Sequence, residues 1–273
     1  MDWLKHMNNA ISYIEENLSD EICIKKAAQL AQCSQYHFMR MFSYIVGISL
    51  SEYVRHRRIT KAAFDLQNGD KVIDVGLRYG YKSPTAFNRA FQAIHGISPS
   101  AAQNSDTPLK AFPSISLQIT VKGVEQIDYR IIQKDAFRAV GIRKEVSAGD
   151  EEYFEVNYSQ EEENAVVDFM GGKSENLLGV FVAENDDGSG YYYLCVETDA
   201  PAPDGMFEVN IPKHKWAVFS GGYDPSCAED LFHRIYTQWL PTADYGIISD
   251  IEMEVYSKES TKGTKYDIWL PIG

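Results

Sequence analysis

The chain repeats itself at a fixed offset of 49 residues, and this repeat limits what its first third can fold into. The two copies share six residues in the pattern Phe38-x-Arg40-x-Phe42-x4-Gly47-Ile48-Ser49 and Phe87-x-Arg89-x-Phe91-x4-Gly96-Ile97-Ser98. Ser34 and Ser83 add a seventh match at the same offset. So many identities at one spacing indicate two copies of one structural unit.

Each copy predicts two short helices joined by a tight turn. Ser34 and Ser83 are favourable N-caps for the second helix, whose phenylalanines lie four residues apart on one face. Gly47 and Gly96 suit the left-handed conformation that ends such a helix. This arrangement is a helix-turn-helix, with a protein-binding helical bundle as the alternative. Residues 50–67 predict a connecting helix about 25 Å long, enough to hold two reading helices about one DNA turn apart.

The net charge also differs between the two parts of the chain. The 273 residues carry a net charge of −13, which taken whole argues against nucleic acid as a partner. Residues 1–104, however, hold 12 basic and 9 acidic side chains, whereas residues 105–273 hold 14 and 30. This asymmetry predicts two domains with different partners, with chance clustering of the charges as the alternative. The polar residues and two prolines of residues 103–113 suit a linker, so the domains are expected at residues 1–104 and 114–273, with the linker at 105–113.

Residues 6–103 resemble the DNA-binding domain of the AraC/XylS transcription regulators. Besides the repeat motifs, the resemblance is carried by Ala28, Leu30, Cys33, Leu50, Glu52, Tyr53, Val54, Arg58, Ile59, Ile73, Gly76, Gly80, Tyr81 and Pro99. It implies an all-α domain with two helix-turn-helix units that binds double-stranded promoter DNA. Gln32 stands where the family usually has glycine, so we expect the first turn to be strained.

The second helix of each copy is expected to present its outward face to the major groove of DNA. The candidate base-reading residues are Gln35, Tyr36, Met39 and Arg40 in the first copy and Thr85, Asn88 and Arg89 in the second. The resemblance implies DNA contact by both arginines, which can pair with guanine; a surface ion pair is the alternative. Arg57 and Lys82 are expected to contact phosphates, which set register rather than sequence.

Beyond residue 113 the pattern changes to β-rich runs. Strands are expected at residues 115–121, 127–133, 137–142, 177–183, 191–198, 215–221, 247–256 and 266–270, and helices at 151–170 and 226–239. The order strand–helix–strand–strand therefore occurs twice. It predicts an α+β domain of two halves related by a pseudo-two-fold axis.

The strand at residues 250–256 gives the clearest indication of a ligand pocket. Glu252, Glu254 and Tyr256 alternate with apolar residues and so share one face, which Asp267 and Trp269 of the last strand are expected to join. A carboxylate among aromatic rings suits an organic cation. The candidate ligand-binding residues are Glu254, Trp269, Tyr256, Trp216, Tyr193, Phe181 and Trp239. The alternative is an exposed carboxylate beside ordinary core aromatics.

Residues 125–272 resemble the GyrI-like effector-binding domain of multidrug-sensing regulators. The resemblance is carried by residues 129–141, 211–219 and 235–241, by Glu254-x-Tyr256 and by residues 268–272. It implies that Glu254 is the acid of the pocket and that Trp269 is an aromatic partner. A DNA-binding domain followed by a GyrI-like domain is similar to the Rob arrangement.

Together these features predict a one-component transcription regulator whose C-terminal domain binds a small, aromatic or cationic effector. RNA polymerase is a further candidate partner. We expect no enzyme activity, cofactor, metal site or membrane segment; the scattered cysteines and the absence of a signal peptide indicate the cytoplasm. Two alternatives remain: a small-molecule hydrolase with Glu254 as the base, and a sequestering module without a small ligand.

Overall fold

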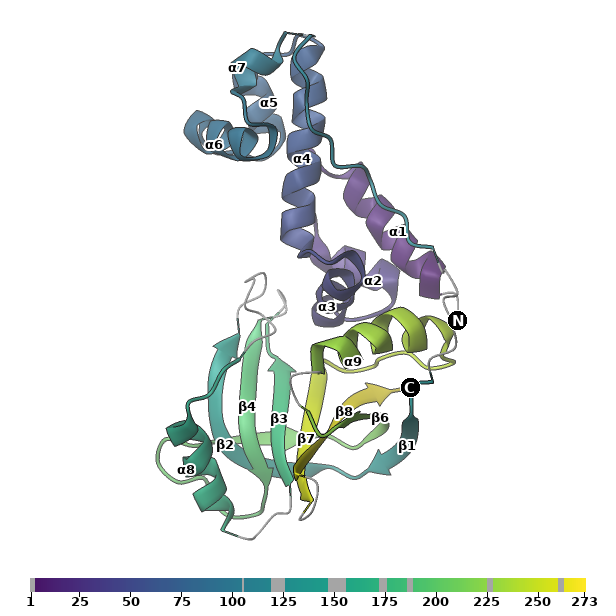
Figure 1. Cartoon of the computed structure of the whole chain (residues 1–273), viewed down its shortest axis with the longest axis vertical. Helices are drawn as coiled ribbons and strands as arrows, with labels where there is room; N and C mark the ends of the chain where they lie inside the picture. Colours follow the sequence, from purple (N-terminus) through teal and green to yellow (C-terminus); the bar gives the residue numbers. More distant parts are fainter. Residues whose placement is uncertain are drawn as a thin grey trace. The chain divides into compact units, whose positions relative to one another are not determined.

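The computed structural model describes residues 3–104, 106–118, 126–146, 156–171, 176–185, 189–224, 228–259 and 263–273 (Figure 1). By their contacts the residues form two compact units. The helical unit contains Asp2–Ala31 and Ile48–Ile119. The sheet unit contains Gln32–Gly47 together with Thr120–Gly273. The division between the units therefore passes through the first sequence repeat.

The helical unit holds most of the first hundred residues. Its helices are α1 (Trp3–Glu16), α2 (Ile24–Ala31), α4 (Leu50–Gln67), α5 (Val72–Arg78), α6 (Pro84–His95) and α7 (Pro99–Ala102). The two phenylalanines of the second repeat, Phe87 and Phe91, are buried with Ile59 and Leu66 of α4 and Val75 of α5. The helices α5 and α6 thus form the helix-turn-helix that the second repeat predicts.

The helix caps follow the repeat in both copies. The side chains of Ser34 and Ser83 accept hydrogen bonds from backbone N–H groups in the first turns of α3 (Gln35–Val46) and α6. Gly47 and Gly96 end these helices with φ of 79° and 74°, so both predicted caps are confirmed. Gln32 has φ of 58° and is the one residue other than glycine with positive φ in the described part of the chain. The strain expected at this turn is therefore present.

Residues 106–118 run along the helical unit without forming a strand (Figure 1). The backbone N–H of Phe112 donates to Thr60 Oγ1 at 3.1 Å, and that of Ile115 donates to Tyr53 Oη at 3.2 Å. Leu117 exchanges two hydrogen bonds with the side chain of Asn8. The strand expected at residues 115–121 is wrong for 115–118, because side chains of α1 and α4 bind this backbone; residues 119–121 lie outside the described residues.

The sheet unit is built on one antiparallel sheet. Its strands are β1 (Tyr129–Lys134), β2 (Phe137–Val146), β3 (Asn176–Ala183), β4 (Gly190–Glu197), β5 (Phe207–Ile211), β6 (His214–Gly222), β7 (Ile251–Glu259) and β8 (Gly263–Ile272). Their order across the sheet is β1-β6-β8-β7-β3-β4-β2-β5. The edge strand β5 was not among the expected strands.

In the described residues, the acidic helix of the sheet unit is shorter than the sequence predicts. The helix α8 spans Gln160–Met170, because Ser159 and Glu162 form a capping box that starts it there. Residues 151–155, where the acidic helix was expected to begin, lie outside the described residues. The helix α9 (Ala228–Arg234) continues into a π-helical turn, η2 (Ile235–Trp239).

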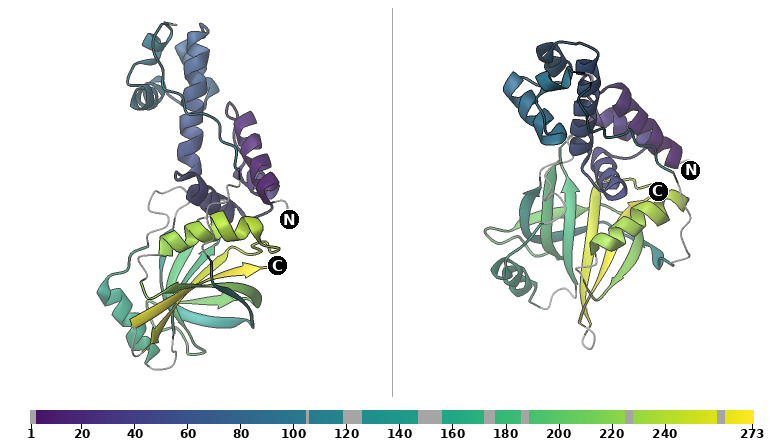
Figure 2. Two further views of the ribbon diagram at one scale, coloured as in Figure 1. Left: turned by 45° about the vertical axis from the view of Figure 1, so that its right-hand side comes forward. Right: turned by 45° about the horizontal axis from the view of Figure 1, so that its top comes forward.

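The two strand–helix–strand–strand halves meet at the centre of the sheet. The segments β2-α8-β3-β4 and β6-α9-β7-β8 occupy corresponding places in the strand order, with β3 pairing β7 between them. This confirms the predicted α+β domain of two halves. The views in Figure 2 show the strong twist of the sheet. Because one buried cluster joins Trp216 near one edge to Val209 and Ile211 at the other, the sheet curls around that face.

The opposite face of the sheet carries the helices. Val166 of α8 packs on Leu194 and Val196 of β4, while Tyr236 of η2 contacts Glu252 of β7. In the described residues, no helix is both long and apolar enough to cross a membrane.

We predict that Gln32→Gly stabilises the protein by about 1 kcal/mol. A side chain in the left-handed region costs roughly 1–2 kcal/mol, which the greater freedom of glycine in the unfolded chain offsets only in part. The measurement is the free energy of unfolding by urea titration. The matched control, Gln29→Gly in the exposed middle of α2, should destabilise by about 1 kcal/mol. A loss of stability in both variants would contradict the strain at Gln32.

Candidate effector site and DNA interface

The strand β7 places two carboxylates on the helix-bearing face of the sheet. Glu252 lies opposite Phe181 of β3, and Glu254 lies opposite Gly179. The alternate residues Ile251, Met253 and Val255 belong to the buried cluster on the other face. The predicted alternation along β7 is therefore confirmed.

Glu254 is half-buried and is held by two tyrosines. Its Oε2 atom accepts hydrogen bonds from Tyr192 Oη at 2.7 Å and from Tyr256 Oη at 2.6 Å. The absence of a side chain at Gly179 makes room for this contact, since a Cβ there would lie 2.0 Å from Tyr192 Oη. Burial, and then the neighbouring Glu254, raise the pKa of both tyrosines, so they remain hydrogen-bond donors to the carboxylate.

Glu252 is almost fully buried, with 4 % of its surface exposed. Its Oε2 atom accepts a 2.5 Å hydrogen bond from Tyr36 Oη and lies 2.9 Å from Arg40 Nε, while Oε1 accepts from Tyr236 Oη at 3.4 Å. Burial raises the pKa of Glu252, and the charge of Arg40 opposes that rise. Burial disfavours the charge of Arg40, but Glu252 holds the pKa of Arg40 well above its ordinary value. The pair forms a buried ion pair within the sheet unit.

Aromatic rings surround the Arg40 guanidinium. Its central carbon lies 4.3 Å from the ring centre of Phe232, 5.5 Å from that of Tyr44 and 5.8 Å from that of Tyr36. Tyr36 also stacks on Phe181, with 4.1 Å between ring centres. A carboxylate with aromatic walls suits an organic cation, and here the Arg40 guanidinium of α3 occupies that place.

The structure separates three of the predicted ligand-binding residues from Glu254. Trp269 pairs with Met253, and Trp216 and Tyr193 belong to the same buried cluster on the face opposite Glu254. Asp267 pairs with Val255 and also lies on that face. The expectation that Asp267 and Trp269 share a face with Glu254 is wrong, because the β7–β8 register places them opposite the apolar residues of β7.

The other predicted ligand residues lie on the helix-bearing face. Tyr256 and Phe181 flank the two carboxylates, whereas Trp239 packs on Phe219 and Tyr129 nearer the β1 edge. Sequence reasoning missed Tyr192, which binds Glu254, and the residues around Arg40, namely Tyr44, Phe232 and Tyr236. Alternation along β4 places Tyr192 on the face opposite Tyr193. Because three tyrosines follow one another there, the sequence does not indicate which of them lies on the face of Glu254.

The predicted DNA-reading residues differ in exposure between the two repeats. Thr85, Asn88 and Arg89 on α6 are exposed, as is Lys82 in the preceding turn. On α3, Tyr36 and Arg40 are 2 % and 8 % exposed, and Gln35 and Met39 are half-buried. The sequence predicts that the reading residues of both repeats are exposed for contact with DNA, and for Tyr36 and Arg40 this is wrong in the structure, because both are buried against the sheet unit.

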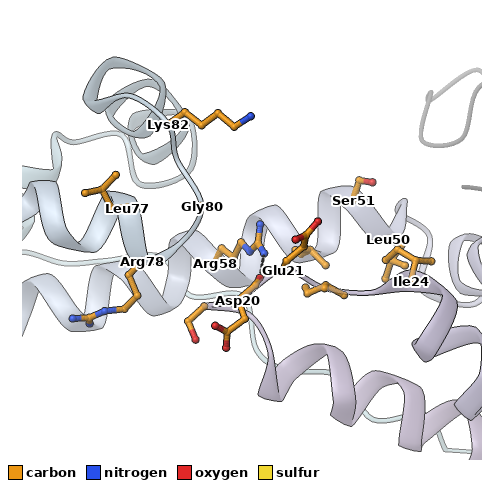
Figure 3. Close-up of a pocket in the computed structure, with 13 residues that line it drawn as sticks. Asp20, Glu21, Ile24, Leu50, Ser51, Arg58, Leu77, Arg78, Gly80 and Lys82 are labelled. Carbon is orange, nitrogen blue, oxygen red and sulfur yellow. Dashed lines mark hydrogen bonds between the residues drawn. The ribbon is translucent and has the colours of Figure 1, made fainter.

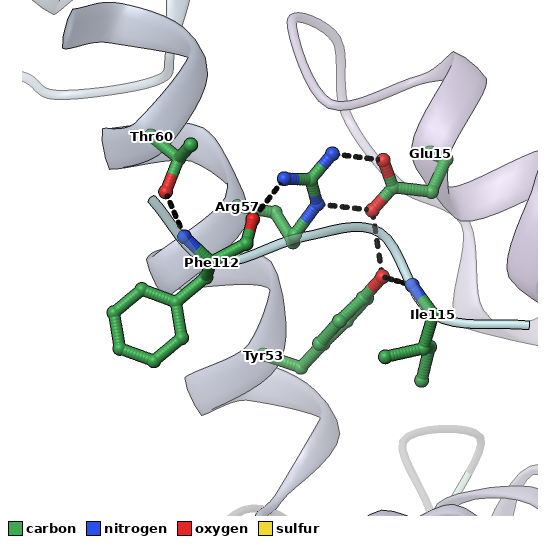
Figure 4. A network of polar contacts seen from close by, with 6 residues as sticks. All are labelled: Glu15, Tyr53, Arg57, Thr60, Phe112 and Ile115. Carbon is green, nitrogen blue, oxygen red and sulfur yellow. Dashed lines mark hydrogen bonds and ion pairs between the residues drawn. The ribbon is translucent and has the colours of Figure 1, made fainter. Parts of the chain in front are cut away.

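Arg57, predicted to contact phosphate, instead joins three parts of the helical unit (Figure 4). Its Nη2 and Nε atoms bind the Glu15 carboxylate of α1 at 2.7 and 2.8 Å, and Nη1 donates to the carbonyl of Phe112. The hydrogen bonds from Arg57 and Tyr53 favour the charged form of Glu15, and its pKa is lowered although burial opposes this. Arg57 therefore fastens α1 and the segment after α7 to α4.

A cleft of about 680 Å³ lies in the helical unit between the residues before α2 and the turn before α6 (Figure 3). Arg58 and Lys82 line it together with Asp20 and Glu21, and Arg58 donates to the backbone carbonyls of Leu18 and Asp20. Arg78 also lines the cleft but is paired with Asp65 and Asp70, so the mixed charge of the lining gives no strong preference for an anion. Among the described residues, no group of three or more His, Cys, Asp or Glu side chains could hold a metal ion.

Comparisons with known protein families match two separate parts of the chain. Residues 130–272 match the family described as integron-associated effector binding protein, and residues 27–105 match the helix-turn-helix domain family. The transcriptional activator AarP of Providencia stuartii is 39% identical over 102 residues, which cover 37% of this chain and 76% of AarP. The multiple antibiotic resistance protein MarA of Salmonella typhimurium is 28% identical over 94 residues, covering 34% of this chain and 74% of MarA.

Solved structures show similarity to each part. The integron cassette protein VCH_CASS2 of Vibrio cholerae has a TM-score of 0.39 at 16% identity, covering 53% of this chain and 95% of that protein. An AraC-type regulator from Chromobacterium violaceum has a TM-score of 0.34 at 22% identity, covering 36% of this chain and 88% of that protein.

The helix-turn-helix repeats and the effector-binding domain define the class: a DNA-binding transcription regulator with its own effector-binding domain. The chain belongs to the AraC family of such regulators, and its C-terminal domain belongs to the integron-associated, GyrI-like effector-binding family. Its relatives are named transcriptional regulators, which points to a non-enzymatic role.

We predict that acidification lowers the free energy of unfolding of the protein, because His37 of α3 is buried in its neutral form. Burial lowers the pKa of His37 to about 4, and its Nε2 atom lies 2.8 Å from the carbonyl oxygen of Ser249. The folded-state pKa of His37 is below the unfolded value of about 6.5. The contribution of neutral His37 to the free energy of unfolding is therefore complete above about pH 6.5 and is lost as pH falls towards 4. Between pH 7 and 4.5 this loss is on the order of 2 kcal/mol.

The measurement compares free energies of unfolding of the wild type and His37→Gln across this pH range. Glutamine can still donate to the Ser249 carbonyl but does not titrate, so the difference isolates His37 from carboxylates that titrate nearby. Parallel pH profiles for the two proteins would show that His37 is not buried in its neutral form.

Proposed function

We propose that this regulator responds to a small aromatic cation bound at Glu254, and that the response alters DNA binding by its helix-turn-helix units. The observation that carries the proposal is the half-buried Glu254 carboxylate, flanked by Tyr192 and Tyr256 on the helix-bearing face of an effector-binding domain. A carboxylate in partly apolar surroundings attracts a cation more strongly than one in water, and aromatic faces add cation–π attraction.

The proposed DNA contacts rest on the exposed face of α6. Arg89, Asn88 and Thr85 project from a helix that is fixed to its unit by Phe87 and Phe91. Arginine at this place on a reading helix can pair with guanine in the major groove. Lys82 is suited to a phosphate contact. With DNA as the partner, the cytoplasm is the proposed place of action.

The helical unit also carries exposed apolar side chains that suit a protein partner. Phe64 of α4 and Ile73 and Leu77 of α5 are exposed. Exposed apolar groups on a DNA-binding unit would be free to meet a protein bound at the same promoter. RNA polymerase is the partner that we propose for this surface.

We predict that Arg89→Ala weakens specific DNA binding by roughly 1–3 kcal/mol, the usual value of a bidentate arginine–guanine pair. The measurement is a gel-shift titration on a binding site obtained by sequencing DNA that the purified protein selects. The control, Arg130→Ala, removes an exposed charge from β1 of the sheet unit and should leave the affinity within about twofold. Equal affinities for wild type and Arg89→Ala would remove Arg89 from the interface.

We predict that Glu254→Gln weakens binding of the aromatic cation N-methylacridinium at least about tenfold, because the substitution removes the charge and retains the size of the side chain. Calorimetry at pH 8 measures the affinity. Acridine, which is neutral at this pH and nearly the same shape, serves as the control ligand and should be affected far less. Equal losses for both ligands, or no loss for either, would contradict a cation site at Glu254.

A further inference from the structure

The two repeats place the same arginine in opposite environments. Arg40 and Arg89 occupy equivalent positions, 49 residues apart, on α3 and α6. Arg89 is exposed, whereas Arg40 is buried against Glu252 of the sheet unit. The same comparison holds for Tyr36, which is buried, and its equivalent Thr85, which is exposed. The sheet unit supplies the partner that buries Arg40.

The contacts of α3 are those of a bound ligand. Arg40 supplies the cation, Glu252 the counter-charge, and Phe232 and Tyr44 the aromatic walls. Tyr36 closes the site by stacking on Phe181 and by donating to the same Glu252 oxygen. A further contact joins His37 to the carbonyl of Ser249, just before β7. Three side chains on one face of α3 are therefore seated on the effector-binding domain.

The α3 site and the Glu254 site share a wall. Glu252 and Glu254 lie on one face of β7, and Tyr192, which binds Glu254, packs against the cluster of Tyr36 and Phe181. A cation at Glu254 would add positive charge close to Arg40 and would compete for the same aromatic surface. Binding at Glu254 is therefore expected to oppose the seating of α3.

We propose that α3 is an internal ligand of the effector-binding domain: Arg40 and Tyr36 are held at Glu252, where the first repeat cannot read DNA, and an aromatic amidinium or guanidinium effector releases them. The proposal rests on the proposed function, because sequestration of α3 matters only if α3 reads DNA. The effector is expected at Glu254, and its class follows from the group that it displaces from the shared aromatic surface, a flat, delocalised cation. The apparent affinity for DNA then depends on the fraction of molecules in which α3 is free.

The first experiment measures release of α3 without DNA. Amide hydrogen exchange of residues 35–46 is followed in the full chain for the wild type, for Glu252→Gln, and for wild type with benzamidinium. We expect faster exchange in α3 for the variant and for the ligand, with α6 as the internal control that stays unchanged. Neutral benzamide should have no effect, and benzamidinium should add nothing to Glu252→Gln.

The second experiment measures DNA affinity by gel shift on the selected binding site. Glu252→Gln should bind at least about fivefold more tightly than wild type, because α3 no longer has to leave a charged site before it reads DNA. Arg40→Ala should bind more weakly, because it removes the reading group itself. Opposite signs at the two ends of one ion pair are not expected from a contact that only stabilises the fold. Glu197→Gln, an exposed carboxylate on β4, controls for loss of negative charge.

The outcomes separate this proposal from the proposed function. Unchanged α3 exchange in Glu252→Gln, or exchange unaffected by benzamidinium, overturns the internal-ligand proposal whatever happens with DNA. Faster α3 exchange with unchanged or weaker DNA binding also overturns it, because α3 is then not held back from DNA. If Glu252→Gln does not fold, Tyr36→Phe replaces it in the exchange experiment, where loss of its hydrogen bond to Glu252 should speed α3 exchange. Failure of Arg89→Ala to alter DNA binding would instead contradict the proposed function.

Discussion

A buried carboxylate in the middle of a sheet needs a partner, and Glu252 has Arg40. An unpaired charge at such a depth would cost several kcal/mol, so whichever segment carries the partner is tied to the sheet. That segment is α3, which is why the sheet unit includes residues 32–47 from the N-terminal part of the chain. The ion pair connects a helix that the repeat assigns to DNA with the part of the chain that belongs to the effector-binding family.

The elements that the sequence predicts well are those specified by local interactions. Ser34, Ser83, Gly47 and Gly96 determine helix ends through contacts within a few residues, so the repeat is sufficient to place α3 and α6. Residues 115–118 look like a strand by composition alone. Their hydrogen bonds instead go to Tyr53 and Asn8, and no local pattern shows that these side chains will be there.

The candidate site could be predicted only in part. Alternation shows which residues of one strand share a face, but it does not show how that strand pairs with its neighbours. The alternation along β7 places Glu252 and Glu254 together correctly. Trp269 pairs with Met253 and so lies on the other face. A shift of one residue in the pairing would exchange the two faces of β8, and the alternation within β8 does not determine which pairing forms. The burial of Arg40 depends on a contact between residues 212 positions apart, so helical periodicity alone indicates only that its face is exposed.

The duplicated arginine shows why one chain can combine two reading helices with a sensor. Both repeats encode the same helix, but only α3 carries tyrosines at 36 and 44 beside its arginine, and these contact the aromatic site around Glu252. The second repeat has Thr85 and Ala93 at the equivalent positions, which offer no such surface. A ligand can shift an equilibrium only if it interacts differently with two states. Under the internal-ligand proposal these differences confine that discrimination to α3, so α6 would keep the same structure in both states while the first repeat responded to the effector.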